Sequence, residues 1–396
     1  MGKINFFPDD LDVQNKKVIL RLDLNVPIKE KVIKDFTRLD LCLPFIKKLV
    51  TKKAKIIIIS HLGRPKGEKD TALSLMPIYK YIKKSLQTNV YFFMGDFDDE
   101  VEYKFSKLKE GEVILIENIR FFKEETDDDN NFSKKLGSLG DIYINDAFSC
   151  SHRKQASIHK ITKYVDIRYG GPLLKKEINA INLIVQNKKE PVTCIIGGSK
   201  ISTKISVITS LIEKVNSLII IGAMANNFLV FKNFKVGKSL VEKNTKEIIE
   251  KIYKKAKKNN CEIIIPVDCR VGTSFDGEGK NKNLDQIEDN DIILDIGSCT
   301  INNIKKKIDQ SNTVLWNGPA GYFENKNFSN GTITIAETIS KNTLERSLIS
   351  VLGGGDTLAA INSIKNKLSF THLSTAGGAF LEYLEGKDLP GLSVLK

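Results

Sequence analysis

The chain has 396 residues, of which 41% are hydrophobic and 28% are charged. This length exceeds the roughly 100–200 residues of one ordinary domain, so we expect two domains. The composition excludes wholesale disorder. The sequence contains no apolar run of the roughly 18–20 residues that span a bilayer. Its first residues lack the apolar stretch of a signal peptide, so we expect a cytoplasmic protein with no membrane partner.

The formal net charge of +13 raises the question of nucleic-acid binding. The lysines, however, are spread along the whole chain, and no nucleic-acid-binding motif accompanies them. Abundant Ile, Asn and Lys together are typical of AT-rich coding sequence, which accounts for the charge without any partner. We therefore expect no nucleic-acid partner.

The six cysteines are scattered and form no CxxC pair. This pattern favours reduced core thiols in a cytosol over a disulfide framework or a zinc site.

Short β-branched runs alternate with helical patterns along the chain, which predicts βαβ units and parallel sheets. The run Ile56–Ile59 is wholly apolar, as is typical of strands that helices cover on both faces. In chain order the predicted strands are Val18–Leu22, Lys55–Ile59, Val113–Ile116, Asp141–Ile144, Val192–Ile196, Ser217–Ile221, Glu262–Ile265, Thr313–Leu315, Leu348–Leu352 and Phe370–Leu373.

Ligands bind beyond the carboxyl ends of the strands in open parallel sheets, so the residues that follow each strand are informative. In the first half they are polar and basic: Asp23, Asn25, Ser60, His61, Arg64, Glu117, Asn118, Arg120, Asp146, His152 and Arg153. In the second half they are mostly glycines: Gly197, Gly198, Gly222, Gly318, Gly321, Gly353, Gly354, Gly355, Gly377 and Gly378. Arginine suits a bidentate grip on phosphate or carboxylate. We expect the first half to hold a compact anion and the second to let its backbone approach phosphates.

A helical pattern over Leu173–Val185 separates the two halves, and the polar run 186–191 follows it. We interpret this stretch as a helix that connects two domains. The acidic run 124–129 is interpreted as a solvated loop or helix start.

The first glycine motif, Gly197-Gly198-Ser199-Lys200, follows a predicted strand. A glycine pair permits a tight turn into a helix, whose first N–H groups favour anions. Lys200 and Lys204 would then lie on one face of that helix. An ordinary pair of surface lysines remains the alternative, and the motif is neither a Walker A loop nor a GxGxxG fingerprint.

Two further glycine loops follow later strands. The motif Gly353-Gly354-Gly355-Asp356-Thr357 suits a phosphate cradle with a carboxylate for Mg²⁺, although Asp356 could simply cap a helix. In the loop 316–324, Glu324 could accept hydrogen bonds from ribose hydroxyls or be an ordinary surface carboxylate.

These motifs resemble those of the phosphoglycerate kinase family, in its order and spacing and over essentially the whole chain. The resemblance rests on Arg21–Pro27, Ser60–Pro65, Glu117–Phe121, Asn145–Phe148 with His152-Arg153, the two glycine motifs, Trp316–Pro319, Val236–Leu240 and Leu384–Lys387. The Gly-Gly-Ser-Lys variant and the chain length are similar to bacterial members. The sequence departs from the family's pattern at Ser149, Ile221, Ser298 and Ala376, of which Ile221 and Ala376 fall near the expected nucleotide pocket.

The resemblance implies two Rossmann-like three-layer α/β domains joined by a hinge helix. Their expected bounds are 1–170, 171–186 for the helix, and 187–379, with a tail, 380–396, that packs back on the first domain. The implied reaction converts 1,3-bisphosphoglycerate and ADP to 3-phosphoglycerate and ATP, reversibly, with Mg²⁺ bound to the nucleotide. We expect a monomeric enzyme that acts in glycolysis in the cytoplasm.

The resemblance also implies roles for individual residues. The expected catalytic residues are Arg38, Lys200, Gly355 and Gly378. Phosphoglycerate is expected to contact Asp23, Leu24, Asn25, Arg38, His61, Leu62, Gly63, Arg64, Arg120 and Arg153. The nucleotide is expected to contact Gly197, Lys200, Lys204, Gly222, Asn317, Glu324, Gly354, Gly355, Asp356 and Thr357, with Asp356 also holding the metal.

Three other functions stay open at this point. A kinase of another small carboxylate, of the acetate kinase type, would use the same chemistry but different motifs. A decayed relative could keep the fold as a binding protein, but Arg38, Lys200 and Asp356 are all present. Nucleic-acid binding would rest on the charge alone.

Overall fold

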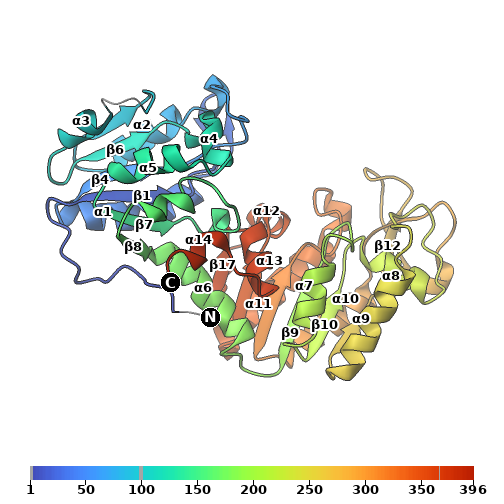
Figure 1. Cartoon of the computed structure of the whole chain (residues 1–396). Coiled ribbons are helices and arrows are strands. Elements are labelled where there is room, and N and C mark those ends of the chain that lie inside the picture. Colours follow the sequence, from blue (N-terminus) through green and yellow to red (C-terminus); the bar gives the residue numbers. More distant parts are fainter. Residues whose placement is uncertain (1–2, 98–100, 365) are drawn as a thin grey trace. The chain divides into compact units, whose positions relative to one another are not determined.

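A computed structural model of the chain describes residues 3–97, 101–364 and 366–396. The chain folds into two compact units, each with a six-stranded parallel sheet and flanking helices (Figure 1). Unit 1 comprises Met1–Ile178 and Asp388–Lys396, and unit 2 comprises Asn179–Lys387. The predicted α/β class with two Rossmann-like sheets is confirmed. Within the described residues, no helix is both long and apolar enough to cross a membrane.

The sheet of unit 1 has the strand order β5-β6-β4-β1-β7-β8. Ile56, Ile57, Ile58 and Ile59 of β4 have no exposed surface, as expected for a sheet covered on both faces. The chain runs from β1 to one side of the sheet and later returns to the other side at β7, so the order reverses between β1 and β7. The strand bounds are β1 Lys17–Leu22, β4 Lys55–Ile59, β5 Val90–Phe93, β6 Val113–Ile116, β7 Ile142–Asp146 and β8 Ile167–Gly170.

Helices and a small hairpin complete unit 1. The hairpin pairs β2 Ile28–Lys29 with β3 Val32–Ile33. The helices are α1 Thr37–Thr51, α2 Met76–Ser85, α3 Val101–Ser106, α4 Lys123–Thr126, α5 Asn130–Ser138 and α14 Pro390–Ser393, with short 3₁₀ turns η1 Thr71–Leu73, η2 Ile119–Phe121, η3 Phe148–Cys150 and η4 Lys160–Lys163.

The sheet of unit 2 has the order β11-β10-β9-β15-β16-β17. Read in chain order, this is the 3-2-1-4-5-6 arrangement of the doubly wound fold, which reverses between β9 and β15. The strand bounds are β9 Val192–Ile196, β10 Ser217–Ile220, β11 Glu262–Ile264, β15 Thr313–Asn317, β16 Ile349–Gly353 and β17 His372–Ser374.

Helices pack against this second sheet. Ile195 and Trp316 of the sheet share one buried cluster with Ile304 of α10 and Ile335 of α11. Trp316 therefore belongs to the core. The helix bounds are α7 Ile205–Leu211, α8 Ala225–Phe231, α9 Lys246–Lys258, α10 Ser298–Asp309, α11 Asn330–Arg346, α12 Gly355–Ser363 and α13 Gly378–Leu384. Two 3₁₀ turns are η5 Leu284–Gln286 and η6 Lys326–Phe328.

All ten predicted strands occur, with ends shifted by at most two residues. The sequence did not predict β5, β8 or a three-stranded antiparallel sheet of β12 Asp268–Gly272, β13 Lys280–Asn283 and β14 Ile292–Ile296. Strand β13 reads Lys-Asn-Lys-Asn and is mostly exposed, so it has no hydrophobic pattern to detect. It pairs with β12 through its main chain.

Helix α6, Pro172–Val185, occupies the stretch that was predicted as a connecting helix. The division between the units falls inside it, after Ile178. Asp388–Lys396 belongs to unit 1, where the N–H of Gly391 donates to the carbonyl of Ser151 at 2.9 Å. Residues 380–387 belong to unit 2. The domain bounds drawn from the sequence stay a prediction.

The six cysteines are free thiols. Five are buried, as predicted, whereas Cys299 is exposed in the first turn of α10. For Cys299 the prediction of a core thiol is therefore wrong.

Candidate functional site

The carboxyl ends of β1, β4, β6 and β7 carry a polar cluster in unit 1. Asp23 follows β1 and is 8% exposed, and His61 follows β4 and is 4% exposed. Arg120 follows β6 and is 5% exposed. Burying three ionisable side chains is costly unless they are paired. Their partners therefore define what this cluster is built to do.

Asp23 pairs with Arg38 in the first turn of α1. Arg38 Nη1 lies 2.6 Å from Asp23 Oδ2, and the same nitrogen donates to the carbonyl of Asn25 at 3.0 Å. The hydroxyl of Ser149, in η3, donates to the same carboxylate oxygen. Burial raises the pKa of Asp23, but the Arg38 guanidinium and the Ser149 hydroxyl outweigh it, so the pKa of Asp23 is lowered and the carboxylate is charged at neutral pH.

A second chain of hydrogen bonds runs from Asn25 to Arg120. The N–H of Gly63 donates to Asn25 Oδ1 at 2.9 Å, and Arg120 Nη1 donates to the carbonyl of Gly63 at 2.8 Å. Burial lowers the pKa of Arg120 to about 10, which leaves it a cation at neutral pH. Its Nε has no hydrogen-bond partner among the described residues. An anion that accepted from Arg120 would satisfy that group.

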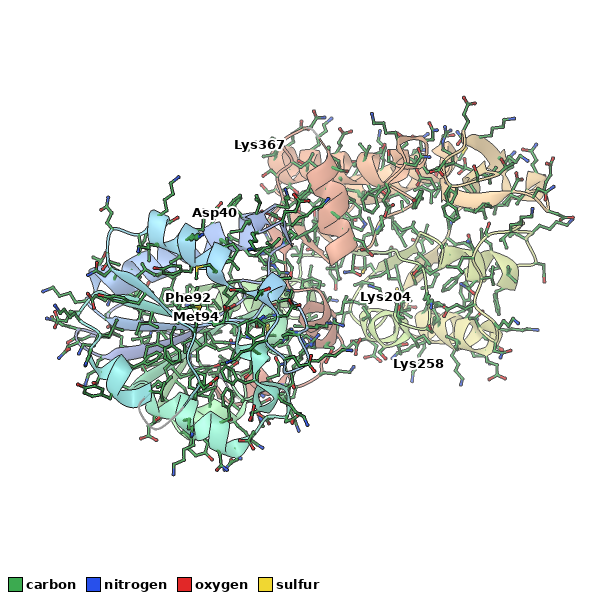
Figure 2. The ribbon with its side chains drawn as sticks, turned by 90° about the horizontal axis from the view of Figure 1, so that it is seen from above. Asp40, Phe92, Met94, Lys204, Lys258 and Lys367 are labelled. Carbon is green, nitrogen blue, oxygen red and sulfur yellow. The ribbon has the colours of Figure 1, made fainter. Side chains whose placement is uncertain are left out.

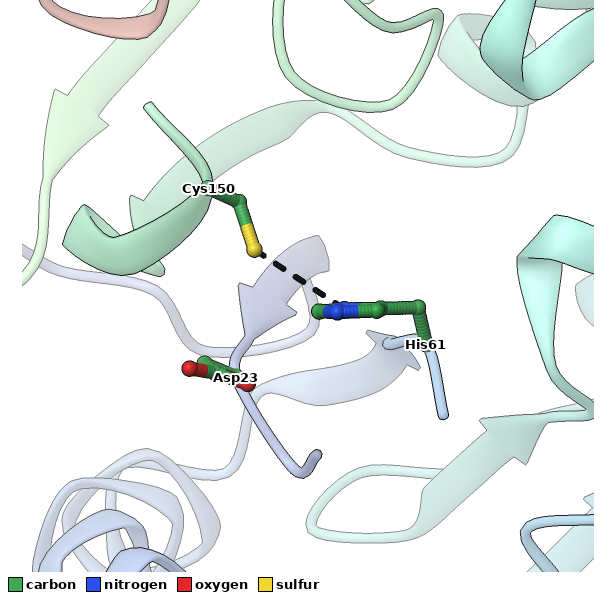
Figure 3. Close-up of side chains that lie close together, drawn as sticks. All are labelled: Asp23, His61 and Cys150. Carbon is green, nitrogen blue, oxygen red and sulfur yellow. Dashed lines mark hydrogen bonds between the residues drawn. The ribbon is translucent and has the colours of Figure 1, made fainter. Parts of the chain in front are cut away.

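His61 is neutral at physiological pH. Burial lowers its pKa well below the usual range, and the Arg21 guanidinium, whose Nη2 lies 3.3 Å from His61 Nδ1, lowers it further. The thiol of Cys150 lies 3.8 Å from the same ring nitrogen (Figure 3). Asp23, His61 and Cys150 bring possible metal ligands within 4.8 Å of one another. However, Arg21 and Arg38 already contact this group, so it favours an anion over a cation.

Arg21 is held by a buried carboxylate that sequence reasoning missed. Arg21 Nε donates to Ser157 Oγ at 2.9 Å, and Ser157 Oγ donates to Glu125 Oε1 at 2.7 Å. Glu125 has no exposed surface, so the interpretation of 124–129 as a solvated segment is wrong at this residue. A lone buried carboxylate inside a charged run gives no signal in the sequence.

The remaining candidates of unit 1 differ in how they are held. Leu24 and Leu62 are buried, and they contribute main-chain groups, with the N–H of Leu24 donating to Ser60 Oγ at 3.0 Å. Arg64 is exposed just beyond β4. Arg153 is half-buried, and its Nε donates to His152 Nε2 at 3.2 Å. Neither Arg64 nor Arg153 is joined to Asp23 by the bonds described above.

Unit 2 presents glycines at the switch point between β9 and β15. Gly197 follows β9 and Gly318 follows β15, with the N–H of Gly197 donating to the carbonyl of Asn317 at 2.7 Å. A Cβ on Gly318 would lie 2.4 Å from the carbonyl oxygen of Gly197, and the φ of Gly318 is +97°. Only glycine fits there, because the obstacle is main chain and the conformation is one that L side chains rarely adopt. Gly222, after β10, also packs on main chain, since a Cβ there would lie 2.8 Å from the amide nitrogen of Gly198.

The third glycine loop leads from β16 directly into α12. Gly354 is the N-cap and supplies no side chain, so the first N–H groups of α12, at Gly355, Asp356 and Thr357, are available to an anion. Gly355 and Asp356 are exposed. Thr357 is buried, and its hydroxyl accepts from the N–H of Gly318 at 2.7 Å and donates to the carbonyl of Gly353. That hydroxyl joins two glycine loops.

The helix predicted to begin at the first glycine motif starts later. Residues 199–201 form an irregular loop and 202–204 a turn, and α7 begins at Ile205 with Lys204 as its N-cap. The prediction that Lys200 and Lys204 share one helix face is therefore wrong. Lys200 is exposed in the loop, whereas the ammonium of Lys204, labelled in Figure 2, donates to Asn317 Oδ1. Asn317 Nδ2 in turn donates to the carbonyl of Gly353 at 2.7 Å.

A cavity of about 330 Å³ adjoins these loops within unit 2. Its walls include Gly198, Gly222, Glu324 and Asp356, and its interior is largely apolar. Small-molecule sites typically have this size and character. Ile221 has no exposed surface and packs in the core cluster beside this cavity. Ala376 is buried before Gly378, which is exposed at the start of α13.

The carboxylate of Asp356 has the chemistry to hold Mg²⁺. Asp356 presents an exposed carboxylate at the start of α12 and at the wall of the cavity. Mg²⁺ is usually held by one or two carboxylates together with substrate phosphates and water, so a single accessible carboxylate beside free N–H groups suits a metal–nucleotide complex.

Fold and site together define the class of protein. Two doubly wound α/β units each carry an edge suited to an anion, one made of arginine and polar side chains and the other of glycine loops beside an apolar cavity. This arrangement suits an enzyme that handles a small anion and a phosphorylated cofactor or nucleotide.

Comparison with known proteins identifies the family. The model of the family described as phosphoglycerate kinase matches residues 8–387. The phosphoglycerate kinase of Wolbachia pipientis wMel is 45% identical over 98% of each chain. The structure of the phosphoglycerate kinase from Coxiella burnetii has a TM-score of 0.87 at 37% identity over 98% of this chain and 97% of that one. The structure of the enzyme from Pyrococcus horikoshii has a TM-score of 0.80 at 28% identity.

The chain belongs to the phosphoglycerate kinase family. It is therefore a kinase of glycolysis, an enzyme that transfers a phosphoryl group, as the resemblance in the sequence implied.

Proposed function

We propose that this enzyme transfers a phosphoryl group reversibly from 1,3-bisphosphoglycerate to ADP, giving 3-phosphoglycerate and ATP. The observation that carries the proposal is the cluster of buried Asp23, His61 and Arg120 with half-buried Arg38 at the edge of one sheet. This cluster has the charge and the hydrogen-bonding groups for a small phosphorylated acid. The glycine loops of unit 2 have the geometry for nucleotide phosphates.

At the proposed phosphoglycerate site of unit 1, the arginines bind the acid, and the other residues of the cluster position the arginines. Arg38, Arg64, Arg120 and Arg153 are the proposed cationic contacts. Asp23 and Asn25 orient Arg38 and Gly63, while neutral His61 offers a hydrogen bond without adding charge. Main-chain groups of Leu24, Leu62 and Gly63 line the same edge.

The chemistry requires no catalytic base. When 3-phosphoglycerate attacks ATP, the nucleophile is a carboxylate with an ordinary pKa near about 4, which is already ionised at neutral pH. Catalysis then consists of positioning and of neutralising the charge on the phosphoryl group in flight. We assign that neutralisation to Arg38 and Lys200, with the N–H groups of Gly355 and Gly378 as additional donors.

On the nucleotide side, we assign the phosphates to Gly197, Gly222, Gly354, Lys200 and Lys204. Glu324 would accept from ribose hydroxyls, and Asp356 would hold Mg²⁺. The metal, when bound, would neutralise charge on the phosphate oxygens. Asn317 and Thr357 position the loops, because their side chains bond to Lys204 and to Gly318.

Direct transfer requires the two ligands to meet during the reaction. We propose α6, which belongs to both units, as the hinge for that step. We also propose a cytoplasmic monomer. Five buried, free cysteines suit a reducing compartment, and each unit has its own hydrophobic core.

A coupled assay with 3-phosphoglycerate, ATP and Mg²⁺ tests the proposal. We expect turnover that requires all three components, and none when acetate replaces 3-phosphoglycerate. Turnover with acetate alone would favour a kinase of another carboxylate. Retention on DNA or RNA at 0.15 M salt that ATP does not displace would point to a nucleic-acid function instead. Size-exclusion chromatography measures the oligomeric state.

A further inference from the structure

Glu125, in α4, is a buried carboxylate that the proposed mechanism does not use. The residue has no exposed surface. Both of its oxygens accept hydrogen bonds from Ser157, Oε2 from the main-chain N–H at 2.8 Å and Oε1 from the hydroxyl at 2.7 Å. Burying a charged carboxylate is costly unless a cation compensates it. Arg21 supplies that cation, since the Ser157 hydroxyl joins its guanidinium to Glu125.

The direction of each hydrogen bond in this chain follows from Arg21. A guanidinium has donors and no acceptor. Its Nε therefore donates to the Ser157 hydroxyl, 2.9 Å away, and that hydroxyl turns its own proton toward Glu125. Nη1 donates to the carbonyl of Leu22. The third nitrogen of the guanidinium, Nη2, lies 3.3 Å from Nδ1 of His61.

The same rule places the proton of the His61 ring. Because Nη2 of Arg21 can only donate, Nδ1 of His61 accepts and carries no proton. A neutral imidazole has one N–H, so that proton is on Nε2. The side chain of His61 is therefore fixed in one of its two neutral forms, the Nε2–H tautomer.

The Nε2 atom of His61 is open to a ligand. It makes no hydrogen bond within the described part of the chain, and, unlike Nε of Arg120, it is not sealed off from solvent. The neighbouring carboxylate of Asp23 is already engaged, because Oδ1 accepts from the N–H of Asn25 at 3.1 Å and Oδ2 accepts from Arg38. A donor without a partner in this cluster suits an anionic ligand.

We propose that Glu125 is a positioning residue of the phosphoglycerate site, which acts through Ser157 and Arg21 to hold His61 as the Nε2–H tautomer and so supplies one hydrogen-bond donor to the acid. The inference deepens the proposed function and rests on it for the identity of the ligand. Glu125 itself does not touch the ligand. Without its charge the guanidinium of Arg21 would be buried uncompensated, and it would no longer be held against Nδ1 of His61.

Nitrogen NMR of the ligand-free enzyme measures the tautomer directly, because protonated and unprotonated ring nitrogens resonate far apart. The chain has four histidines, and the resonances of His61 are those that His61→Gln removes. We expect Nε2 to carry the proton in the wild type, and Glu125→Gln to convert part of the population to the Nδ1–H tautomer. Ser157→Ala breaks the same chain at its centre and should act in the same direction.

Steady-state kinetics measure the consequence for binding. Glu125→Gln should raise the KM for 3-phosphoglycerate about 3- to 10-fold, the contribution of one hydrogen bond, and leave the KM for ATP unchanged. Glu112→Gln is the matched control. Glu112 is also a buried carboxylate of unit 1, but it lies at the amino end of β6 and accepts from Asn89 and from the N–H of Lys109. Its substitution should lower stability and leave the KM and the tautomer as in the wild type.

A wild-type His61 that is protonated at Nδ1 would overturn the inference, whether or not any variant folds. A folded Glu125→Gln enzyme with the wild-type tautomer and KM would overturn it too. An equal rise in KM in Glu112→Gln would do the same, since it would show a general loss of stability. If the enzyme does not turn over 3-phosphoglycerate at all, the proposed function fails, while the tautomer measurement still decides whether Glu125 positions His61.

Discussion

The polar cluster of unit 1 and the glycine loops of unit 2 lie at equivalent places, beyond the carboxyl ends of parallel strands on either side of a switch point. They are made of different groups. In unit 1 the contacts are between side chains, such as Arg38 with Asp23 and Arg120 with Gly63. In unit 2 they are largely between main-chain atoms, such as Gly197 with Gly318.

The difference follows from what each site has to hold. A small acid has few atoms, so its recognition needs several charged side chains with fixed positions, each held by a partner. A chain of nucleotide phosphates can be held by successive N–H groups, and this requires close approach of the main chain rather than charge. Side-chain changes should therefore affect function in unit 1, and added carbon atoms should affect stability in unit 2.

The largest effect is expected from Arg38. Arg38→Ala should reduce kcat by about 10³-fold or more, the scale of arginine residues that neutralise a phosphoryl group in transfer. Arg168, in β8 of the same unit, bonds to the carbonyl of Thr162 and is the control, with near-normal turnover expected for Arg168→Ala. Steady-state kinetics decide the point, and near-normal kcat in Arg38→Ala would show that the role assigned to Arg38 is wrong.

The main-chain packing of unit 2 predicts a loss of stability at Gly318. Gly318→Ala would force a Cβ to within 2.4 Å of a main-chain oxygen at a φ of +97°, and should lower the free energy of unfolding by about 3 kcal/mol. Gly355→Ala is the control, since a Cβ there meets no described atom within 4 Å.

Urea denaturation of both variants measures this effect. We expect Gly355→Ala to unfold like the wild type but to show a raised KM for ATP, because the added methyl group lies where the phosphates approach. A stable Gly318→Ala enzyme would mean that the loops can move apart.

Two buried carboxylates, one in each unit, allow the units to be compared through the pH dependence of stability. Burial raises the pKa of Asp146, in unit 1, to about 7. Its Oδ1 accepts from the N–H of Leu174 at 2.9 Å, while its Oδ2 has no partner among the described residues. The pKa of Asp146 is higher in the folded state than in the unfolded state, so the folded state binds more protons at intermediate pH. The free energy of unfolding therefore falls as the pH rises from about 4 to about 7.

Asp146→Asn keeps the acceptor for Leu174 and cannot ionise. The free energy of unfolding of this variant, relative to that of the wild type, should therefore increase by about 2–3 kcal/mol between pH 5 and pH 8. Asp295, in unit 2, also has a pKa raised to about 7 by burial, but its two oxygens accept from the N–H groups of Ile296 and Gly331. Asp295→Asn should instead destabilise the protein at both pH values. Unfolding curves at pH 5 and pH 8 separate these outcomes.

The smallest effect is expected at Ser149. Ser149→Ala removes one donor from Asp23, which should lower kcat/KM about 3- to 10-fold. The same change should raise the pKa of Asp23, so the acid limb of the pH–rate profile should move to higher pH. Ser149→Thr retains the hydroxyl and should restore the wild-type profile. An unchanged acid limb in Ser149→Ala would exclude this positioning role.

The strands of the two sheets were predicted well from the sequence, because a wholly apolar run such as Ile56–Ile59 is typical of a strand in a sheet that helices cover on both faces. It could not predict β13, which has no hydrophobic side chains to reveal it and is held by main-chain pairing. The start of α7 was placed too early because the glycine pair at 197–198 gives no sign of the turns that precede Ile205.

The same limits apply to the sites. Residues in the loops that follow strands, such as Asp23, His61 and Arg120, were found because strand ends converge at one edge. Glu125 was missed, since its importance lies in its burial and in its bond to Ser157, and neither property follows from residue type.

The contact of Gly197, Gly222 and Gly318 with neighbouring main chain also limits how this enzyme can change over generations. A steric conflict between two side chains can be relieved by shortening one of them, which opens a route through paired substitutions. A Cβ at any of these three positions would meet carbonyl or amide atoms that every residue possesses. No second substitution at the contacting residues removes those atoms. The glycine loops are thus closed to compensatory change, while the side-chain cluster of unit 1 is open to it.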